Sequence, residues 1–510
     1  MNKMLDLLKK GFDLSRNINL TIKGYILTGM IWALLATILG LVNELQLMAL
    51  LPLPDLLDYG HLRPVYTLLL IFGSLLSFFF AGSYWILQKE TGAILLAPAG
   101  WVGFKLHQTA LIVGVVFILL DANKGREYGE LFWIADNLMA LALVLFLVTS
   151  VTAIKMAGKS GVVLTSIVVT AAGALVIYLV GNVNLPYSAL GSVSPARGMQ
   201  DAALQEAYRT GVLVYFILMP AFTLLYFFIP AYYKVGIFSE SLFRFQVLAI
   251  IVLVPLAAGA GLVYSAAPEG LQTLGIVAGM ALAVAIMAGG LNLHYSLTRS
   301  GKRFQSDALG LLIRFSLFFL IVASVLRIVL APRFVQAALG FTWLNPRDIA
   351  FDAQTYVLMI MLAGGLYMFQ KINEHTLSAR NLKLIAGLAI AGIALMFVAN
   401  IGHGAIQAVE RSATASNGDL AVQEWSKIVY AGSFAQQEHE PTAANPAAAE
   451  EADKEPAGIV ARYMLSLRGV YFTGNVLIAL AVLLAVLTFL IRASRSGKGY
   501  TEPDLTAANT

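Results

Sequence analysis

GYILTGMIWALLATILGLVNELQ, residues 24–46, carries a single charged side chain, Glu44. A helix needs about 20 mainly apolar residues to cross the ~30 Å hydrocarbon layer of a bilayer, and this stretch meets that need. Eleven further segments of similar composition follow it: 64–87, 103–121, 131–154, 162–182, 208–232, 243–264, 270–294, 308–332, 352–371, 382–402 and 468–491. The sequence therefore predicts an all-α integral membrane protein with about twelve transmembrane helices.

The composition of the whole chain indicates the same class of protein. Hydrophobic residues make up 59% of the 510 positions and charged residues 12%, whereas soluble globular proteins carry about 25% charged residues. A soluble enzyme is therefore excluded. The chain has no cysteine, which excludes disulfides, thiolate metal sites and iron–sulfur ligands. The net charge of +5 does not indicate a nucleic-acid partner, because topology distributes Lys and Arg in membrane proteins.

The segments between the spans predict how the chain is divided. Residues 1–23 form a basic cytoplasmic leader, 24–402 a bundle of eleven helices, 464–491 the twelfth helix and 492–510 a cytoplasmic tail. Basic residues concentrate in the segments that share a side with the N-terminus, so we expect both termini in the cytoplasm, at a bacterial inner membrane. Residues 403–463 form an external acidic loop, rich in Ala, Glu and Pro, which we expect to be partly disordered. This loop is either a docking segment or a tolerated insertion.

Ionisable side chains are scarce inside the predicted spans. Arg327 is the one charge clearly within a span, and it either faces a cavity or an anionic group, or extends to the outer interface. The six histidines form no pair at helical spacing. The chain is therefore poorly equipped with the buried carboxylates and histidines that a proton relay uses.

Several stretches, in matching order and spacing, resemble subunit I of the cbb3-type haem–copper oxidases. They are KGYILTGMIWALLATILGLVNELQLMALLP (23–52), GHLRPVYT (60–67), KGREYGELFWIADNL (124–138), GNVNLPYSALGS (181–192), LLYFFIP (224–230), VYSAAPEGLQTLG (263–275), GGLYMF (364–369) and MLSLRGVYFTGNVLIAL (464–480). The resemblance implies a twelve-helix, subunit I-like bundle around buried haem b and copper. It also implies assembly with a membrane-anchored cytochrome c or other redox subunit. The implied number of helices agrees with the independent count of spans.

The resemblance implies histidine ligands for two haems, and this chain departs from the family at those positions. The second helix of the family carries an axial histidine of the low-spin haem, where Tyr66 stands here. The tenth helix carries a His-x-His pair, one histidine for each haem, where this chain has Ile349 and Phe351. Tyrosine can bind haem iron, but Tyr66 would lack an opposite ligand.

The copper ligands that the resemblance implies are replaced as well. The sixth helix of the family carries one histidine and the seventh carries two, and the aligned residues here are Thr210, Ala260 and Gly261. The ninth span, SLFFLIVASVLRIVL (316–330), also lacks the tyrosine and glutamate that the family leads one to expect. Haem iron and copper in this family need imidazole nitrogens, and Ile, Phe, Ala and Gly offer no donor atom. We therefore predict no catalytic residue, no metal ligand and no bound haem or copper.

Three functions remain open at this point. The first is a haem-less, non-catalytic relative of oxidase subunit I that scaffolds a respiratory or electron-transfer complex in contact with membrane lipid. The second is a genuine cbb3-type cytochrome c oxidase or nitric oxide reductase. The third is a transporter of a small molecule or of protons, which the count of twelve spans alone suggests. A visible absorption spectrum separates the second from the others.

Overall fold

The computed structural model describes residues 18–415 and 456–493, apart from 93–95, 189–190, 300–306, 341, 345–348 and 374–376. Within these residues, twelve helical spans are long and apolar enough to cross a membrane, which confirms the predicted all-α membrane bundle. Most of the tail 492–510 and most of the basic leader 1–23 lie outside the described residues.

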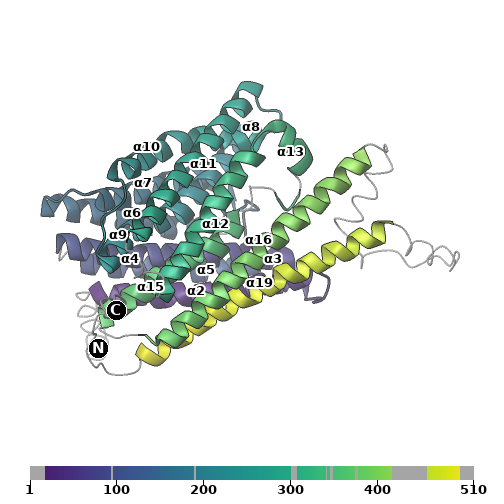
Figure 1. The fold of residues 1–510 in the computed structure, drawn as a ribbon. Helices are drawn as coiled ribbons and strands as arrows, with labels where there is room; N and C mark the ends of the chain where they lie inside the picture. Colours follow the sequence, from purple (N-terminus) through teal and green to yellow (C-terminus); the bar gives the residue numbers. More distant parts are fainter. Residues whose placement is uncertain are drawn as a thin grey trace.

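The described residues form sixteen α-helices, of which fifteen build the twelve spans and one, α13, lies between two of them. In chain order they are α2 (Ile18–Leu47), α3 (Tyr59–Leu68), α4 (Leu76–Thr91), α5 (Leu96–Leu119), α6 (Trp133–Ala157), α7 (Val162–Gly181), α8 (Met199–Gly211), α9 (Met219–Tyr233), α10 (Glu240–Ala257), α11 (Glu269–Thr298), α12 (Ala308–Leu330), α13 (Arg333–Leu339), α14 (Ile349–Asp352), α15 (Leu358–Asn373), α16 (Ala379–Ala415) and α19 (Pro456–Ala493). Two short strands, β1 (Leu185–Pro186) and β2 (Ser192–Val193), pair antiparallel between α7 and α8. Figure 1 shows the spans gathered into one bundle, with α8 and α13 at one end of it.

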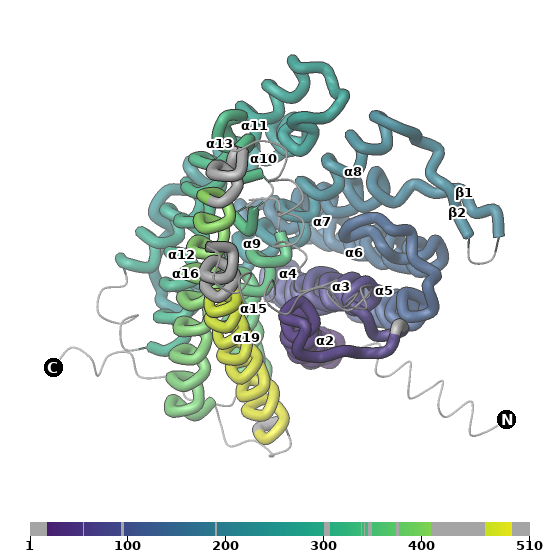
Figure 2. Tube along the Cα trace, turned by 90° about the vertical axis from the view of Figure 1, so that its right-hand side faces the viewer, coloured from purple at the N-terminus to yellow at the C-terminus, as the bar shows by residue number. Residues whose placement is uncertain are grey.

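Three spans lie at the centre of the bundle. In the span formed by α3 and α4, 94% of the most apolar stretch is buried, and in the spans α8–α9 and α14–α15 the value is 89%. The other nine spans range from 39% to 56%. Figure 2 shows α4, α9 and α15 in the middle, enclosed by the remaining helices. The central spans therefore decide what the interior of the protein can bind.

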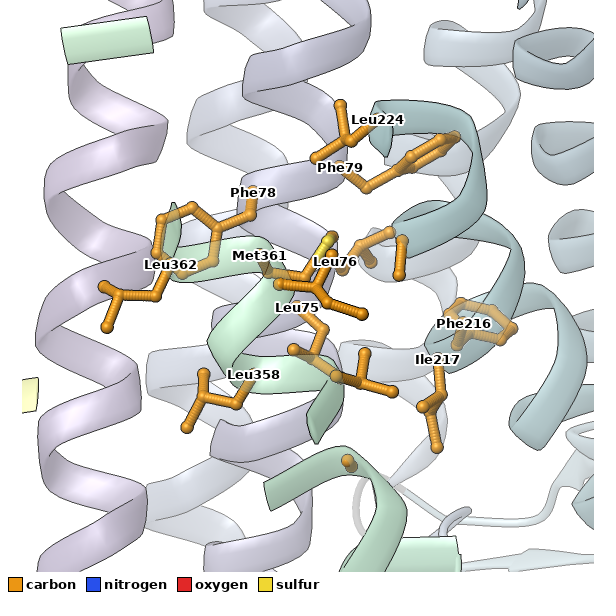
Figure 3. Packing of buried hydrophobic residues seen from close by; sticks show 14 of the residues in the cluster. Leu75, Leu76, Phe78, Phe79, Phe216, Ile217, Leu224, Leu358, Met361 and Leu362 are labelled. Carbon is orange, nitrogen blue, oxygen red and sulfur yellow. The ribbon is translucent and has the colours of Figure 1, made fainter. Parts of the chain in front are cut away.

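The three central spans pack on one another through large apolar side chains. Figure 3 shows Leu75, Phe216 and Leu358, one from each span, converging in this core. Gly82 of α4 is required by the close approach of α9, because a Cβ at this position would overlap the side chain of Leu224. Small residues that let two helices approach closely are a common feature of helix packing in membranes. This part of the core is filled by the chain itself.

Each central span is interrupted by a short π-helical segment. The segments are Leu69–Leu75, Val212–Leu218 and Ala353–Val357, and all three contact one another. A π-helical segment inside an α-helix inserts an extra residue per turn and often occurs at functional sites. The centre of the bundle is thus the first place to search for such a site.

Several helix boundaries differ from the sequence prediction; α8, for example, begins at Met199 rather than at 208. α5 begins at Leu96 rather than at 103, and the charge of Lys105 is accommodated over the Trp101 ring at 5.3 Å. α16 continues to Ala415 and α19 begins at Pro456, so both ends of the predicted loop 403–463 are helical; 416–455 lie outside the described residues. Ala-rich sequence favours helix past the membrane boundary, and proline is well tolerated at a first helical position. Figure 1 shows α16 and α19 side by side, extending beyond the other helices.

Candidate functional site

Four of the six degenerate ligand positions lie at the start of the three central spans. Tyr66 belongs to α3, Thr210 to α8, and Ile349 and Phe351 to α14. These are the second, sixth and tenth spans, so they cross the membrane in the same direction and bring the four residues to the same end of the bundle. In each span the π-helical segment begins two or three residues after a ligand position.

Ala260 and Gly261 reach this end of the bundle from a different element. They lie in a 3-10 turn, Ala258–Leu262, that follows α10 and packs against α8. The turn therefore packs against the helix that carries Thr210.

A cavity of about 360 Å³ is lined by both Tyr66 and Phe351. The Tyr66 hydroxyl donates a hydrogen bond of 2.5 Å to Oε1 of Gln354, and the amide of Gln354 donates to Oδ1 of Asn475. This polar chain links α3, the segment 353–357 and α19. Asn43 also lines the cavity, and its buried Oδ1 has no hydrogen-bond partner among the described residues. We call this space the first cavity.

Aromatic rings form one wall of the first cavity. The ring of Phe351 lies 4.9 Å from that of Phe397 and 6.4 Å from that of Tyr471. Tyr471 in turn contacts Trp343 edge-on, with the ring centroids 5.5 Å apart. Phe351 is thus held in an aromatic cluster, where offset and edge-to-face pairs stabilise packing by about 0.5–1.5 kcal/mol each.

Charged side chains form the outer rim of the first cavity. Arg63 bonds Glu127 at 2.7 Å, and Arg209 lies 4.0 Å from the same carboxylate and also pairs with Glu206. Sequence reasoning did not single out these residues. They flank ligand positions, since Arg63 precedes Tyr66 by three residues, and Arg209 directly precedes the sixth-helix position. Their proximity in sequence to the predicted ligand positions could have identified them.

A second cavity, of about 130 Å³, is lined by Thr210, Ala260, Gly261 and Ile349 together. The structure thus brings together the three positions aligned with copper ligands and one position aligned with a haem ligand. The carboxylate of Glu206 lies directly against Gly261, where even a Cβ would overlap it. A larger side chain at this position would have to displace Glu206.

Arg327 also lines the second cavity, and it is paired with Asp352. The Arg327 side chain is 14% exposed and the Asp352 side chain 4%. Oδ1 of Asp352 accepts a further hydrogen bond of 2.6 Å from the Tyr356 hydroxyl. Of the two possibilities for Arg327, the structure therefore has it facing an anionic group. Sequence reasoning missed Asp352, although a buried arginine calls for such a partner and Asp352 is the one acidic residue in the predicted span 352–371.

The described histidines do not supply ligands to these cavities. They are His61, His107, His294 and His403, and none of them lines either cavity. Nε2 of His107 donates to the Phe72 carbonyl at 2.8 Å, and the His403 ring packs on Trp343. No group of three His, Asp or Glu with the arrangement of a metal site occurs among the described residues; His375 and His439 lie outside them. The residues that line the two cavities therefore do not fit haem iron or copper as this family binds them.

The loop between α5 and α6 carries two buried groups that titrate near neutral pH. Burial raises the pKa of Glu130 to about 7. Burial, together with the nearby charge of Arg126, lowers the pKa of Lys124 to about 7. Lys124 pairs with Asp136, whose other carboxylate oxygen accepts a hydrogen bond of 2.8 Å from Tyr178. The charges of Glu130 and Lys124 therefore change near neutral pH.

The sequence of the chain and its twelve-span architecture match a known family. The profile described as Cytochrome C and Quinol oxidase polypeptide I matches residues 21–435. The chain belongs to this family. The match confirms the resemblance to subunit I of the haem–copper oxidases, and the architecture of this subunit I-like chain is the one expected from that resemblance.

Curated relatives and a solved structure agree with the family. Cytochrome c oxidase subunit 1 of Rhodobacter capsulatus is 27% identical over 261 residues, which cover 49% of this chain and 48% of the relative. The cbb3-type cytochrome c oxidase subunit CcoN1 of Stutzerimonas stutzeri is 25% identical over 368 residues, covering 68% and 75%. The chain thus spans about half the length of the first relative and three quarters of the second.

The fold of this subunit I-like chain is also seen in an experimental structure. A cryo-EM structure described as a heme-copper terminal oxidase dimer superposes with a TM-score of 0.66, covering 94% of this chain and 86% of that chain. The sequences are 14% identical, so this likeness shows the fold alone.

Proposed function

We propose that this member of the family is a haem-less, non-catalytic subunit that scaffolds a respiratory or electron-transfer complex. The observation that carries the proposal is the chemistry of the two cavities. Six residues aligned with histidine ligands line them, and none of the six has an imidazole. Iron and copper in this family need nitrogen donors to be held and to react with dioxygen.

The contacts of the replacing residues support the same proposal. Phe351 packs in an aromatic cluster, the Glu206 carboxylate lies against Gly261, and Arg327 pairs with Asp352 at the second cavity. Each of these contacts is made between residues of the chain itself and needs no cofactor. A bundle stabilised in this way can still present its outer surfaces to other subunits.

The partner, the orientation and the division of the chain belong to the proposal as well. We propose a membrane-anchored cytochrome c or other redox subunit as partner, because subunit I of the cbb3-type oxidases assembles with such subunits. Twelve crossings return the chain to the side on which α2 begins, and Lys89, Lys234 and Lys371 end the three central spans on that side. By the positive-inside rule that side is the cytoplasm, at a bacterial inner membrane. The loop 403–463 is then external.

A visible absorption spectrum with metal analysis tests the absence of haem. The full chain, purified from the membranes of cells grown with ample haem and copper, is expected to show no Soret band and no stoichiometric iron or copper. A stoichiometric b-type haem would overturn the proposal. It would favour a genuine cytochrome c oxidase, the activity that the names of the relatives give for them, or a nitric oxide reductase.

Purification of the native complex tests the scaffold role. The tagged full chain is expected to retain a second subunit with covalently bound haem c, which haem staining of a denaturing gel detects. A chain that purifies alone after mild solubilisation and cross-linking contradicts the scaffold role. A matched control is an unrelated tagged membrane protein from the same cells, which should retain no such subunit.

A further inference from the structure

A cavity of about 860 Å³ in the described part of the chain lies away from the six predicted ligand positions. It is a groove between α7 and α10, and its lining includes Glu90 of α4 and Phe227 of α9. The rest of the lining comes from the first half of α7, the first two thirds of α10 and the segment that precedes each of these two helices. The groove therefore opens at the end of the bundle that we assign to the cytoplasm.

The depth of this groove corresponds to one leaflet of a bilayer. Its α10 lining runs from Glu240 to Ile251, which at 1.5 Å per residue is about 17 Å. Its α7 lining runs from Val162 to Val169 and is shorter. A transmembrane helix of a partner subunit would need a groove along the full ~30 Å of hydrocarbon. A lipid acyl chain needs only half of that length.

The two ends of the groove differ in chemistry. The end at the membrane surface holds two cations, Lys159 and Arg244, and two anions, Glu90 and Glu240. Arg244 and Glu240 are 3.7 Å apart and both are well exposed, so neither is committed to the protein interior. The first turn of α7 also lines this end, and no side chain caps its backbone N–H groups. Deeper in the bilayer the lining is apolar.

We infer that the groove binds one zwitterionic phospholipid of the cytoplasmic leaflet, with phosphatidylethanolamine as the ligand that fits. Lys159 and Arg244 would hold the phosphate, and Glu90 and Glu240 the ammonium group. One acyl chain would lie along Val247 and the other apolar residues of α10. The balance of two positive and two negative side chains favours a zwitterionic over an anionic headgroup, because an anionic lipid would leave two carboxylates beside its negative charge. The inference does not depend on the absence of haem.

The experiment measures which lipids stay with the full chain. The protein, in its native complex, is washed extensively in mild detergent, and the retained lipids are extracted and quantified by mass spectrometry. We expect a stoichiometric amount of phosphatidylethanolamine, enriched over phosphatidylglycerol relative to the source membrane. Equal or greater enrichment of phosphatidylglycerol would overturn the inference, as would the retention of neither lipid.

A pair of tryptophan variants on one helix separates the groove from the general lipid surface. Leu248 lines the groove and is 62% exposed, whereas Val252 lies one turn further along α10, is 52% exposed and lines no part of it. Leu248→Trp is expected to reduce the retained phosphatidylethanolamine by roughly ten-fold, because displacing even two methylene groups has that effect. Val252→Trp is expected to leave it unchanged. Equal retention by the two variants would contradict binding in the groove.

Charge variants test the headgroup assignment. Removing both anions with Glu90→Gln and Glu240→Gln is expected to shift retention from phosphatidylethanolamine to phosphatidylglycerol. Removing both cations with Lys159→Gln and Arg244→Gln is expected to lower the retention of both lipids. All four side chains are at the surface end of the groove, so the variants should elute and unfold like the unmodified chain. Unchanged lipid selectivity in the anion-free variant would refute the zwitterionic assignment.

Discussion

Replacing Asp352 with asparagine is expected to destabilise the protein strongly, although the two side chains have almost the same shape. Asp352 is 4% exposed and neutralises Arg327, which is 14% exposed inside the bundle. Asparagine keeps an oxygen that can accept the hydrogen bond from Tyr356, so the substitution removes the negative charge and little else. Removing one partner of a buried ion pair costs about 3–5 kcal/mol of unfolding free energy, because the other charge stays buried without compensation.

The size of the effect is expected at the lower end of this range, about 3 kcal/mol, since the exposed part of Arg327 lets water reach the guanidinium group. Arg327→Leu should have an effect of similar size, because Asp352 would then keep a buried charge with only Tyr356 beside it. The double variant, Arg327→Leu with Asp352→Leu, should lie within about 1–2 kcal/mol of the unmodified protein, because replacing a buried pair by apolar residues is often close to neutral.

Equilibrium unfolding in mixed micelles, followed by tryptophan fluorescence, measures these differences. The exposed pair formed by Arg333 and Glu269, at 2.6 Å, is the matched control: Glu269 is 82% exposed, so Glu269→Gln should change stability by less than about 1 kcal/mol. The reasoning is wrong if Asp352→Asn is no more damaging than Glu269→Gln. It is also wrong if the double variant is less stable than both single variants.

Three further predictions concern the first cavity and the outer loop. Tyr66→His combined with Phe351→His should let the folded protein take up a b-type haem, detected as a Soret band; a folded double variant that binds none would contradict the assignment of these positions. Gln354→Leu should lower the unfolding free energy by about 1–3 kcal/mol, because it removes the hydrogen bonds that join Gln354 to Tyr66 and to Asn475, and Asn475→Ala, which removes one of them, should cost less. The raised pKa of Glu130, about 7, favours the protonated form in the folded state, so its contribution to stability is full below pH 4.5 and is lost as pH rises to 7. Glu130→Gln should therefore flatten the pH dependence of thermal unfolding between pH 5 and 7, and an unchanged profile would rule this group out.

The spans and their order were predictable because the thickness of the bilayer sets the length of a helix, whatever surrounds it. The positions at which helices end in water were not predictable, since the bilayer does not limit the length of a helix there. α16 continues to Ala415, and α19 begins at Pro456. The ligand positions are predicted from their spacing to the family-like stretches, and the structure places the six residues at one end of the bundle. The charged residues that pack around these positions were missed. Glu206 lies just before the predicted sixth span, and Asp352 is the first residue of the predicted tenth span.

The arrangement of the central spans explains how the fold can persist when its metal ligands are replaced. All six positions lie at one end of the bundle, on helices or turns that begin there, whereas much of the apolar packing between the central spans lies further along the same helices. The close contact of Gly82 with Leu224 belongs to that later part, and it depends on no residue of the two cavities. Substitutions at the ligand end therefore act on local polar pairing, where Glu206 and Asp352 compensate two arginines, and leave the packing that fixes the helix positions unchanged. Because the two regions are separable, the loss of haem and copper that we propose needs no change in the bundle. The Asp352 variants measure how much the polar end contributes to the stability of the whole protein.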